Sequence, residues 1–469
     1  MTSIESELRD RAVQHGQEHV FAFWDNLDGG QRNALLDQLA AVDFELVERQ
    51  AQLLDTSATD EHTELNFSPP ELFPLERSGD GERQAQAAAE HGAELMRAGK
   101  VAFLLVAGGQ ASRLGYDGPK GAFPVGPVSG RSLFEIHARR LRAAQARYAQ
   151  SFDWYVMTSP ANDANTRAFF AEHDHFGMLP EQIVFFPQAM IPALDLEGRI
   201  LMSAPDSLFL APNGHGGTLA ALRSAGLLER ARKNGVETFS YFQVDNPLVR
   251  PADPLFLGLH ASRGARMSSK VVSKRDAGEK VGVIGKVNGV LGCIEYSDLP
   301  ADCREARDVS GRLAFGAGNI AAHLLQVDFV EELTAMQLEL PWHVARKRMN
   351  VVGPDGQPTE VDGAKFETFI FDALGKSAQS VTLEVAREFE FSPVKNAEGE
   401  DSPLTARQAL CSLYGDWLTA AGEELPAADA HGTHPVEIDP LVAEDRESFL
   451  GASVPAPIRL PAGLLYDRS

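Results

Sequence analysis

The sequence has few cysteines and lacks any pair of them at metal-binding or redox spacing. Its three cysteines, Cys293, Cys303 and Cys411, lie far apart, and none belongs to a C-x-x-C motif. This arrangement argues against a structural zinc site and against a disulfide framework. We therefore expect free, buried thiols in a reducing compartment.

Long apolar runs and an N-terminal targeting signal are also missing. The chain starts Met-Thr-Ser-Ile-Glu-Ser-Glu-Leu, with neither a basic segment nor an apolar core. No stretch approaches the roughly 18 apolar residues that a membrane-spanning helix needs. We therefore predict a soluble, cytoplasmic protein.

Positive charge is scarce. The 469 residues include 43 Lys and Arg against 66 Asp and Glu, which gives a formal net charge of -23. Such an acidic surface argues against nucleic acid or an anionic membrane as a partner. A phosphate-bearing substrate would need locally gathered cations or a metal ion. The sequence leaves the oligomeric state open.

Two familiar phosphate-binding motifs are absent. The G-x-G-x-x-G fingerprint does not occur at Gly108-Gly109-Gln110, where the spacing differs. The G-x-x-x-x-G-K-[ST] loop is also missing, because Lys120 follows Pro119 and precedes Gly121. Without that loop, a P-loop kinase or ATPase is excluded.

A different candidate phosphate-binding loop is present. Residues 101–106 are all apolar, which predicts a strand buried on both faces of a parallel sheet. Gly108 and Gly109 follow, and they let backbone N–H groups approach an anion closely. Arg113 and Lys120 come next, and both side chains can reach a phosphate.

Strand-like and helix-like segments alternate from residue 101 to about residue 350. This alternation predicts an α/β fold with a central mixed, mostly parallel sheet flanked by helices. Further predicted strands are 154–158, 183–186 and 238–244, with helices at 132–149 and 218–233. Ligands in such sheets bind beyond the carboxyl ends of the strands.

We expect three parts along the chain. Residues 1–99 form a helical N-terminal region, in which the apolar residues from Leu36 to Leu46 make one helical stripe. Residues 100–405 form the main α/β domain. Residues 406–469 form a small C-terminal domain that begins with a helix at 406–422.

Two segments after predicted strands hold candidate ligand-binding residues. Asp245 directly follows the strand at 238–244, where a carboxylate is well placed to hold Mg²⁺ or, alternatively, to cap a turn. His215 lies among glycines before a helix, where backbone amides are exposed to a ligand. The alternative for His215 is a structural histidine.

The loop spacing Gly108-Gly109-x-x-x-Arg113-Leu114-Gly115-x-x-x-Pro119-Lys120 resembles the signature of sugar-nucleotide pyrophosphorylases. More narrowly, it is similar to the UTP-dependent sugar-1-phosphate uridylyltransferases, which include UDP-N-acetylglucosamine pyrophosphorylase. Segments 244–246, 318–323 and 391–397 resemble further motifs of that family, in the same order. The chain departs from the pattern at Ala111-Ser112, at Ala189 and at His215.

The resemblance implies a fold and a reaction. The fold is the Rossmann-like one of nucleotide-diphospho-sugar transferases, with residues 100–405 as the catalytic domain. The reaction is uridylyl transfer from UTP to a sugar 1-phosphate, by direct in-line attack with Mg²⁺ on Asp245. N-acetylglucosamine 1-phosphate is the expected acceptor, and glucose 1-phosphate or a broader range of sugars is the alternative.

The resemblance also implies roles for individual residues. The catalytic residues at the phosphates are Arg113, Lys120 and Lys395. Nucleotide contacts are implied for Gly108, Gly109, Gln188, His215, Gly216 and Asp245. Sugar contacts are implied for Glu295, Asn319, Phe369 and Phe371.

Some of these roles have structural alternatives. Phe369 and Phe371 share one face if their segment is a strand, and they then either line the acetamido pocket or simply pack in the core. Asn319 either binds the sugar or caps a turn. A non-catalytic sensor on the same fold would be favoured only if Lys120, Asp245 or Lys395 were missing.

Overall fold

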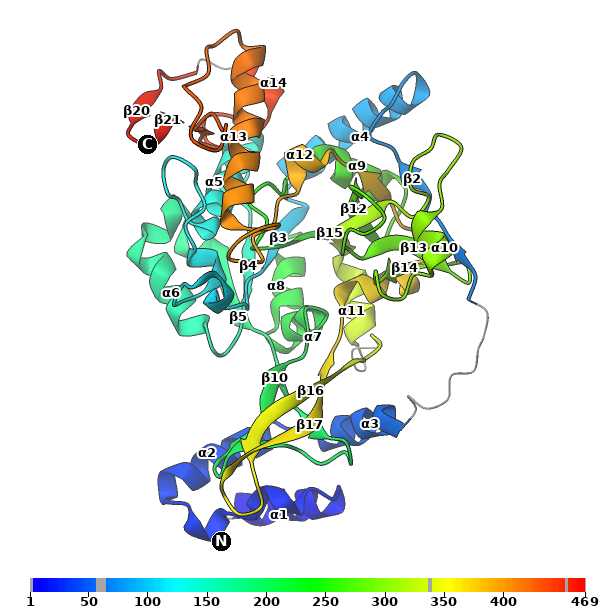
Figure 1. Cartoon of the computed structure of the whole chain (residues 1–469), viewed down its shortest axis with the longest axis vertical. Helices are drawn as coiled ribbons and strands as arrows, with labels where there is room; N and C mark the ends of the chain where they lie inside the picture. The colour runs from blue at the N-terminus through cyan, green and yellow to red at the C-terminus, as the bar shows by residue number, and fades with distance from the viewer. Residues whose placement is uncertain (1–2, 56–64, 336–339, 452–453, 469) are drawn as a thin grey trace. The chain divides into compact units, whose positions relative to one another are not determined.

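A computed structural model describes residues 3–55, 65–335, 340–451 and 454–468 (Figure 1). The chain forms two compact units, each assembled from segments that are far apart in the sequence. Unit 1 comprises residues 1–64, 188–220 and 338–370, and unit 2 comprises residues 65–187, 221–337 and 371–469. The boundaries predicted at residues 99/100 and 405/406 stay a prediction.

Unit 2 is built on an 11-stranded mixed sheet. Its main path runs β2-β18-β12-β15-β11-β3-β4-β5, and five of the seven pairings along this path are parallel. The predicted α/β fold with a mixed, mostly parallel sheet is therefore confirmed. The strands are β1 (Phe67–Ser68), β2 (Leu72–Phe73), β3 (Val101–Val106), β4 (Trp154–Thr158), β5 (Ile183–Pro187), β11 (Thr238–Gln243), β12 (Met267–Ser273), β13 (Val283–Val287), β14 (Val290–Ile294), β15 (Ala317–Gln326) and β18 (Thr382–Glu384).

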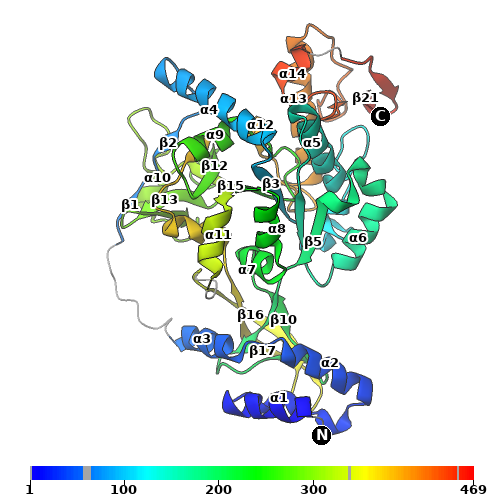
Figure 2. The same ribbon diagram turned by 180° about the vertical axis from the view of Figure 1, so that it is seen from behind.

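Helices cover both faces of this sheet. Figures 1 and 2 show α4 (Asp80–Arg97) and α9 (Pro254–Ser262) on one face, and α8 (Leu227–Lys233) and α11 (Val327–Thr334) on the other. Central strands are accordingly buried on both faces, as their continuous apolar runs predict. The other helices of unit 2 are α5 (Leu133–Tyr148), α6 (Asp163–Glu172), α10 (Ala301–Glu305), α12 (Arg387–Glu390), α13 (Pro403–Ala420) and α14 (Arg446–Gly451).

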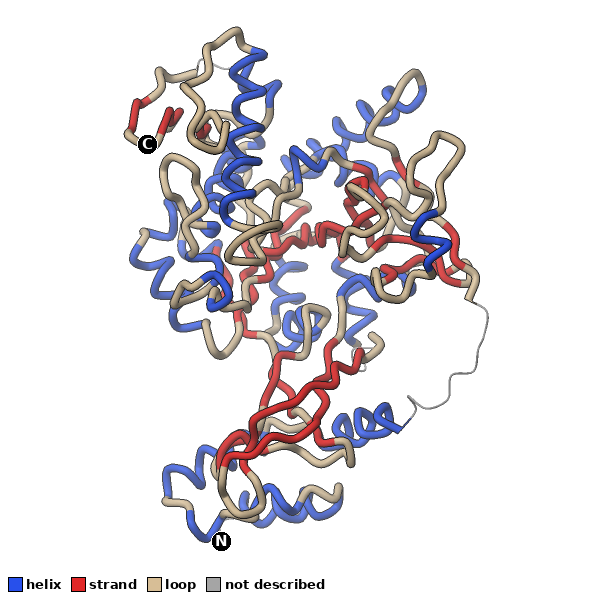
Figure 3. Tube along the Cα trace, viewed as in Figure 1, coloured by secondary structure: helices blue, strands red, loops and turns tan. Residues whose placement is uncertain are grey.

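Unit 1 consists of three N-terminal helices packed on an antiparallel ribbon, whose strands are red in Figure 3. The single apolar stripe expected from Leu36 to Leu46 is wrong, because residues 41–43 separate two helices. The helices are α1 (Ser3–Gln14), α2 (Gly29–Ala40) and α3 (Phe44–Asp55), with α7 (Gly217–Ser224) at the edge of the unit. The strands are β6 (Met190–Pro192), β7 (Leu194–Asp195), β8 (Met202–Ala204), β9 (Ser207–Leu208), β10 (Leu210–Pro212), β16 (His343–Val352) and β17 (Pro358–Glu367).

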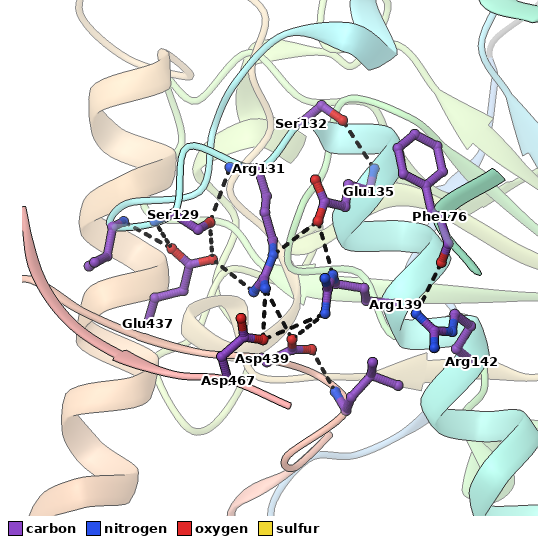
Figure 4. Close-up of polar contacts among 12 residues, drawn as sticks. Ser129, Arg131, Ser132, Glu135, Arg139, Arg142, Phe176, Glu437, Asp439 and Asp467 are labelled. Carbon is purple, nitrogen blue, oxygen red and sulfur yellow. Dashed lines mark hydrogen bonds and ion pairs between the residues drawn. The ribbon is translucent and has the colours of Figure 1, made fainter. Parts of the chain in front are cut away.

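The C-terminal part of unit 2 is a small sheet of β19 (Val436–Ile438), β21 (Gly463–Tyr466) and β20 (Ile458–Leu460) beside α13. Ion pairs join this sheet to the start of α5 (Figure 4). Arg131 Nη2 lies 2.8 Å from Asp467 Oδ1 and 3.2 Å from Asp439 Oδ2, and Arg139 also pairs with Asp439. The side chain of Asp439 is fully buried within this network.

Glu437 of β19 fastens the loop that precedes α5. Its carboxylate accepts hydrogen bonds from the backbone N–H groups of Val128 and Ser129, at 2.9 and 2.8 Å, and from the Ser129 hydroxyl at 2.7 Å. These contacts fix a segment that begins a few residues after Lys120. The small C-terminal sheet therefore holds part of the loop that carries a candidate phosphate ligand.

The buried Asp439 predicts a pH dependence of stability. Burial raises the pKa of Asp439 to about 7, and its hydrogen bond to Asp467 contributes to the rise. The same hydrogen bond lowers the pKa of Asp467, so that of these two acids it is Asp439 that titrates near neutrality. Between about pH 4 and pH 7 the folded chain keeps a proton that the unfolded chain releases, so the free energy of unfolding falls as the pH rises.

Thermal melts at pH 5 and pH 8 check this expectation. We expect Asp439 to contribute a decrease in Tm on the order of a few degrees at the higher pH. Asp439→Asn should flatten the pH profile by that amount, whereas Asp302→Asn, at an exposed position on α10, should keep the wild-type profile. An Asp439→Asn profile parallel to that of the wild type would contradict the prediction.

Candidate active site

The glycine-rich loop after β3 is closed by backbone and side-chain hydrogen bonds. The Lys120 N–H donates to the carbonyl of Gly109 at 3.0 Å, which brings the lysine back to the end of the strand. A Cβ added at Gly109 would meet no protein atom within 4 Å. The backbone there is thus accessible to a ligand. Gly108 precedes it directly, and Arg113 is exposed on the short helix Ser112–Leu114.

Lys120 and Asp245 meet at the carboxyl ends of two adjacent parallel strands. β3 pairs with β11 in parallel, and Lys120 and Asp245 follow these strands. Lys120 Nζ lies 3.2 Å from Asp245 Oδ2, and the two side chains are only 18% and 14% exposed. The strand order therefore places a cation and a carboxylate, 125 residues apart in sequence, at one point.

Lys395 belongs to a segment that is attached to Asp245. The Val394 N–H donates to the Asp245 carbonyl at 2.8 Å. Asn246 secures the same segment, since its Nδ2 donates to the Glu390 carbonyl at 2.7 Å and its Oδ1 accepts from the Ser392 N–H. The Lys395 side chain is 47% exposed, with its Nζ 3.7 Å from Asp401. The structure thus brings the backbone beside Lys395 next to Asp245, whose side chain contacts Lys120.

Glu295 and Asn319 lie close together in the β13–β14–β15 part of the sheet. Asn319 Nδ2 is 3.7 Å from the Sγ of Cys293, and a Cβ added at Gly282 would meet both Cys293 and Glu295. Asn319 Oδ1 also accepts from the N–H of Ala321, whose φ of 54° is left-handed. Asn319 therefore has a local structural role beside the sugar contact predicted for it.

The candidate residues of unit 1 form a second group. His215 Nδ1 accepts from the Ile370 N–H at 3.2 Å, and its ring stacks on Phe369 at 5.3 Å. Burial, together with the neighbouring His343, lowers the pKa of His215 to about 4, so its ring is neutral at pH 7. A neutral imidazole is better suited to a hydrogen bond with the uncharged part of a nucleotide than to binding its negatively charged phosphates. Gln188 directly follows β5 and is buried.

Gly216 is required by the protein's own packing. Its N–H donates to the Thr368 carbonyl at 2.8 Å. A Cβ at this position would approach backbone atoms of Thr368 and Phe369 to within 2.8 and 2.9 Å, which is too close for any side chain. This glycine therefore has a structural explanation beside its predicted nucleotide contact.

Phe369 and Phe371 do not lie on a strand. β17 ends at Glu367, and a short helical turn at Ile370–Lys376 follows. The condition for a shared strand face is therefore not met, because the alternation of aromatics continues past the point where the ribbon pairing stops. Phe369 stacks on His343, with ring centroids 4.3 Å apart, and Phe371 is buried.

Three side chains that contact the candidate site residues or their backbone were not predicted from the sequence. Asn162 is fully buried, and its Nδ2 donates to the carbonyls of Ala107 and Gly109 at 2.9 and 3.2 Å. His137 Nε2 lies 3.1 Å from the Val244 carbonyl, and burial lowers the pKa of this histidine to about 4. His343 is the third, through its stacking on Phe369. No local pattern marks any of them.

Neither a cluster of metal-ligating side chains nor a membrane-spanning helix occurs within the described ranges. No group of three or more His, Cys, Asp or Glu side chains is arranged to hold a metal ion among the residues with described positions. None of the described helices is both long and apolar enough to span a membrane.

A family model described as UTP–glucose-1-phosphate uridylyltransferase (UDPGP) matches residues 57–421. The chain belongs to the UDPGP family. The predicted family relationship is thereby confirmed, and the protein is a nucleotidyltransferase of the UDP-sugar pyrophosphorylase type. The matched range contains the glycine-rich loop, Asp245 and Lys395.

Individual UDPGP-family relatives agree over nearly the whole chain. UDP-N-acetylhexosamine pyrophosphorylase-like protein 1 of Xenopus tropicalis is 37% identical over 484 residues, covering 96% of this chain and 94% of the relative. UDP-N-acetylglucosamine pyrophosphorylase of Saccharomyces cerevisiae is 35% identical, with 89% and 92% covered. The solved structure of the uridine diphosphate N-acetylglucosamine pyrophosphorylase from Trypanosoma brucei aligns with a TM-score of 0.79 at 28% identity, covering 96% of this chain and 95% of that one.

Proposed function

We propose that this chain transfers a uridylyl group from UTP to N-acetylglucosamine 1-phosphate and releases pyrophosphate. The observation that carries the proposal is the pairing of Lys120 and Asp245, 3.2 Å apart, beside the open backbone at Gly109. A phosphate loop with one lysine and one carboxylate suits the binding of a nucleoside triphosphate with a divalent cation.

The reaction needs positioning and charge neutralisation more than it needs a reactive side chain. An oxygen of the sugar 1-phosphate bonds to the α-phosphorus of UTP, while the bond from that phosphorus to the β-phosphate oxygen breaks. The acceptor phosphate is already ionised at neutral pH, so no protein nucleophile is required. The protein's task is to align two polyanions and to stabilise the charge on the equatorial oxygens.

The loop and its cations meet these needs. We assign the backbone amides around Gly108 and Gly109, with Arg113 and Lys120, to the triphosphate and the leaving pyrophosphate. Lys395 is assigned to the charge that develops at the α-phosphate. Its half-exposed side chain can move toward a substrate, while the backbone beside it stays attached to Asp245.

Mg²⁺ fits this arrangement. Protein sites for Mg²⁺ commonly provide one or two carboxylates and leave the remaining positions to phosphate oxygens and water. Asp245 offers one such carboxylate at the end of β11, and we propose that it holds the ion. When bound, the ion supplies additional positive charge between the two polyanions.

The remaining predicted contacts stay part of the proposal. Glu295 and Asn319 are assigned to the sugar hydroxyls, and their proximity around Cys293 supports a common ligand. Unit 1 carries the predicted nucleotide contacts of Gln188, His215 and Gly216 and the predicted sugar contact of Phe369. Phe371, which is buried, keeps its predicted sugar contact as a proposal.

Measuring pyrophosphate release with three acceptors tests the proposal. UTP and Mg²⁺ are combined separately with the 1-phosphates of N-acetylglucosamine, N-acetylgalactosamine and glucose. We expect kcat/KM for the N-acetylglucosamine compound to exceed that for glucose by about 10- to 100-fold, as one or two extra pocket contacts supply. The names of the relatives favour this acceptor.

Glucose 1-phosphate is the second candidate acceptor. The description of the matching family model names glucose 1-phosphate, and we count the departure from the family pattern at His215 in favour of this acceptor. A higher kcat/KM with glucose 1-phosphate would replace the first proposal by this one. No release with any of the three acceptors would refute uridylyl transfer to these sugars altogether.

A further inference from the structure

Unit 2 contains a cavity of about 690 Å³ that none of the proposed substrate contacts uses. It lies between α4, α5, α9 and α13, with α12 and α14 completing its wall. A volume of this size is typical of sites for small organic ligands. The apolar part of its lining includes Leu75, Leu255, Leu383, Phe389, Leu413 and Trp417.

Most acidic side chains of the lining are already neutralised by partners. Lys270 Nζ lies 2.8 Å from Asp253 and 2.6 Å from Glu390. Asp445 pairs with Arg147 at 3.0 Å and with Arg250 at 3.3 Å. Glu444 also lines the wall, 3.9 Å from Arg147 Nη1, and burial raises its pKa to about 7, so that at neutral pH it is only partly ionised. Little free negative charge therefore remains in the buried part of the wall to attract a cationic ligand.

Arg140 of α5, unlike these paired side chains, lines the cavity without an ion-pair partner among the described residues. Its side chain is only 7% exposed, yet among the residues with described positions no carboxylate forms an ion pair with it. Its Nη2 donates to the Pro247 carbonyl at 3.0 Å, while its Nε is buried without a hydrogen-bond partner. Burial lowers the pKa of this guanidinium, although Tyr414, Glu444 and Glu390 act in the opposite direction. A buried cation without an anionic partner is costly in a folded protein.

We propose that this cavity is a second ligand site, which binds a small amphipathic monoanion. The anionic group, a carboxylate, sulfonate or phosphate, pairs with Arg140. The apolar body of the ligand, a ring or a short acyl chain, packs against Leu255, Phe389 and Trp417. The ligand thus supplies the missing counter-ion and at the same time covers the apolar wall.

The site is connected to the segment that carries Lys395. Phe389 and Glu390 line the cavity, and the Glu390 carbonyl accepts the hydrogen bond from Asn246, which directly follows Asp245. An occupant therefore touches the segment that carries Lys395 and that is hydrogen-bonded to the residue after Asp245. The cavity itself contains none of the proposed substrate-binding residues.

Titration with 8-anilinonaphthalene-1-sulfonate tests the proposal. This probe joins one sulfonate to an aromatic body and fluoresces when it is shielded from water. The titration uses the full chain with saturating UTP and Mg²⁺. We expect one site per chain, with energy transfer from Trp417, and about 10- to 100-fold weaker binding by Arg140→Met, because a charge-assisted hydrogen bond is lost.

A pair of matched variants keeps the test decisive if Arg140→Met fails to fold. Phe389 and Leu404 are both 44% exposed, but only Phe389 lines the cavity. Phe389→Asp should abolish probe binding, whereas Leu404→Asp should leave it unchanged. Probe binding that occurs only when UTP is left out, equal loss in both aspartate variants, or undiminished binding by Phe389→Asp would overturn the proposal.

Discussion

Asp245→Asn is expected to lower kcat for pyrophosphate release by about 10²- to 10³-fold, the usual effect of removing one group that stabilises transition-state charge. The amide keeps the shape of the carboxylate but cannot neutralise Lys120, 3.2 Å away, or hold Mg²⁺ with a full charge. The rate is measured at saturating UTP and N-acetylglucosamine 1-phosphate over a range of Mg²⁺ concentrations. The concentration of Mg²⁺ required for half-maximal rate should rise as well.

Asp298→Asn is the matched control for this experiment. Asp298 is an exposed aspartate of unit 2, and its substitution should leave both kcat and the Mg²⁺ requirement unchanged. A thermal melt of each variant separates a loss of chemistry from a loss of folding. If folded Asp245→Asn kept a rate within about twofold of the wild type, the assignment of Asp245 as metal ligand would fail.

Lys395→Met should lower kcat by about 10²-fold with little change in Tm. The side chain is 47% exposed and its contact with Asp401 is 3.7 Å long, so the folded structure depends little on it. Its proposed task is to stabilise the charge at the α-phosphate, which is greatest in the transition state. The loss should therefore appear in kcat, measured by initial rates at saturating substrates, more than in KM for UTP.

Lys233→Met provides the comparison, because Lys233 is an exposed lysine at the end of α8. It changes the net charge of the chain by the same amount and should retain the wild-type rate. A normal kcat with a raised KM for UTP in Lys395→Met would show that this lysine only binds the nucleotide. Equal rates in the two variants would remove Lys395 from the phosphate site.

Much of the central sheet could be predicted from the sequence because buried parallel strands are continuous apolar runs. The predicted strand at 154–158 coincides with β4, and the one at 238–244 ends one residue beyond β11. The helix predicted at 218–233 is two helices, since Gly226 adopts a left-handed φ of 68° between them. These strands and helices are determined largely by residues within the segment itself, so the pattern of apolar residues in each segment predicts them.

Contacts between distant segments could not be predicted in this way. β7 pairs with β17 across about 170 residues, so that residues 188–220 and 338–370 join the N-terminal helices in one unit. The hydrogen bonds from Asn162 to the glycine-rich loop could not be predicted from the sequence either, because an isolated asparagine before a helix has many possible partners. Lys120 and Asp245, in contrast, could be named as candidate ligand-binding residues because each follows a recognisable strand.

The hydrogen bonds that the Glu437 carboxylate accepts from Val128 and Ser129 join parts of the chain that are synthesised at very different times. Glu437, which accepts the hydrogen bond of the Val128 N–H, is translated 309 residues after Val128. At ribosomal rates of about 5–20 residues per second, this delay is about 15–60 seconds. The loop after Lys120 therefore lacks its carboxylate partner until β19 has left the ribosome, long after the loop itself has been made.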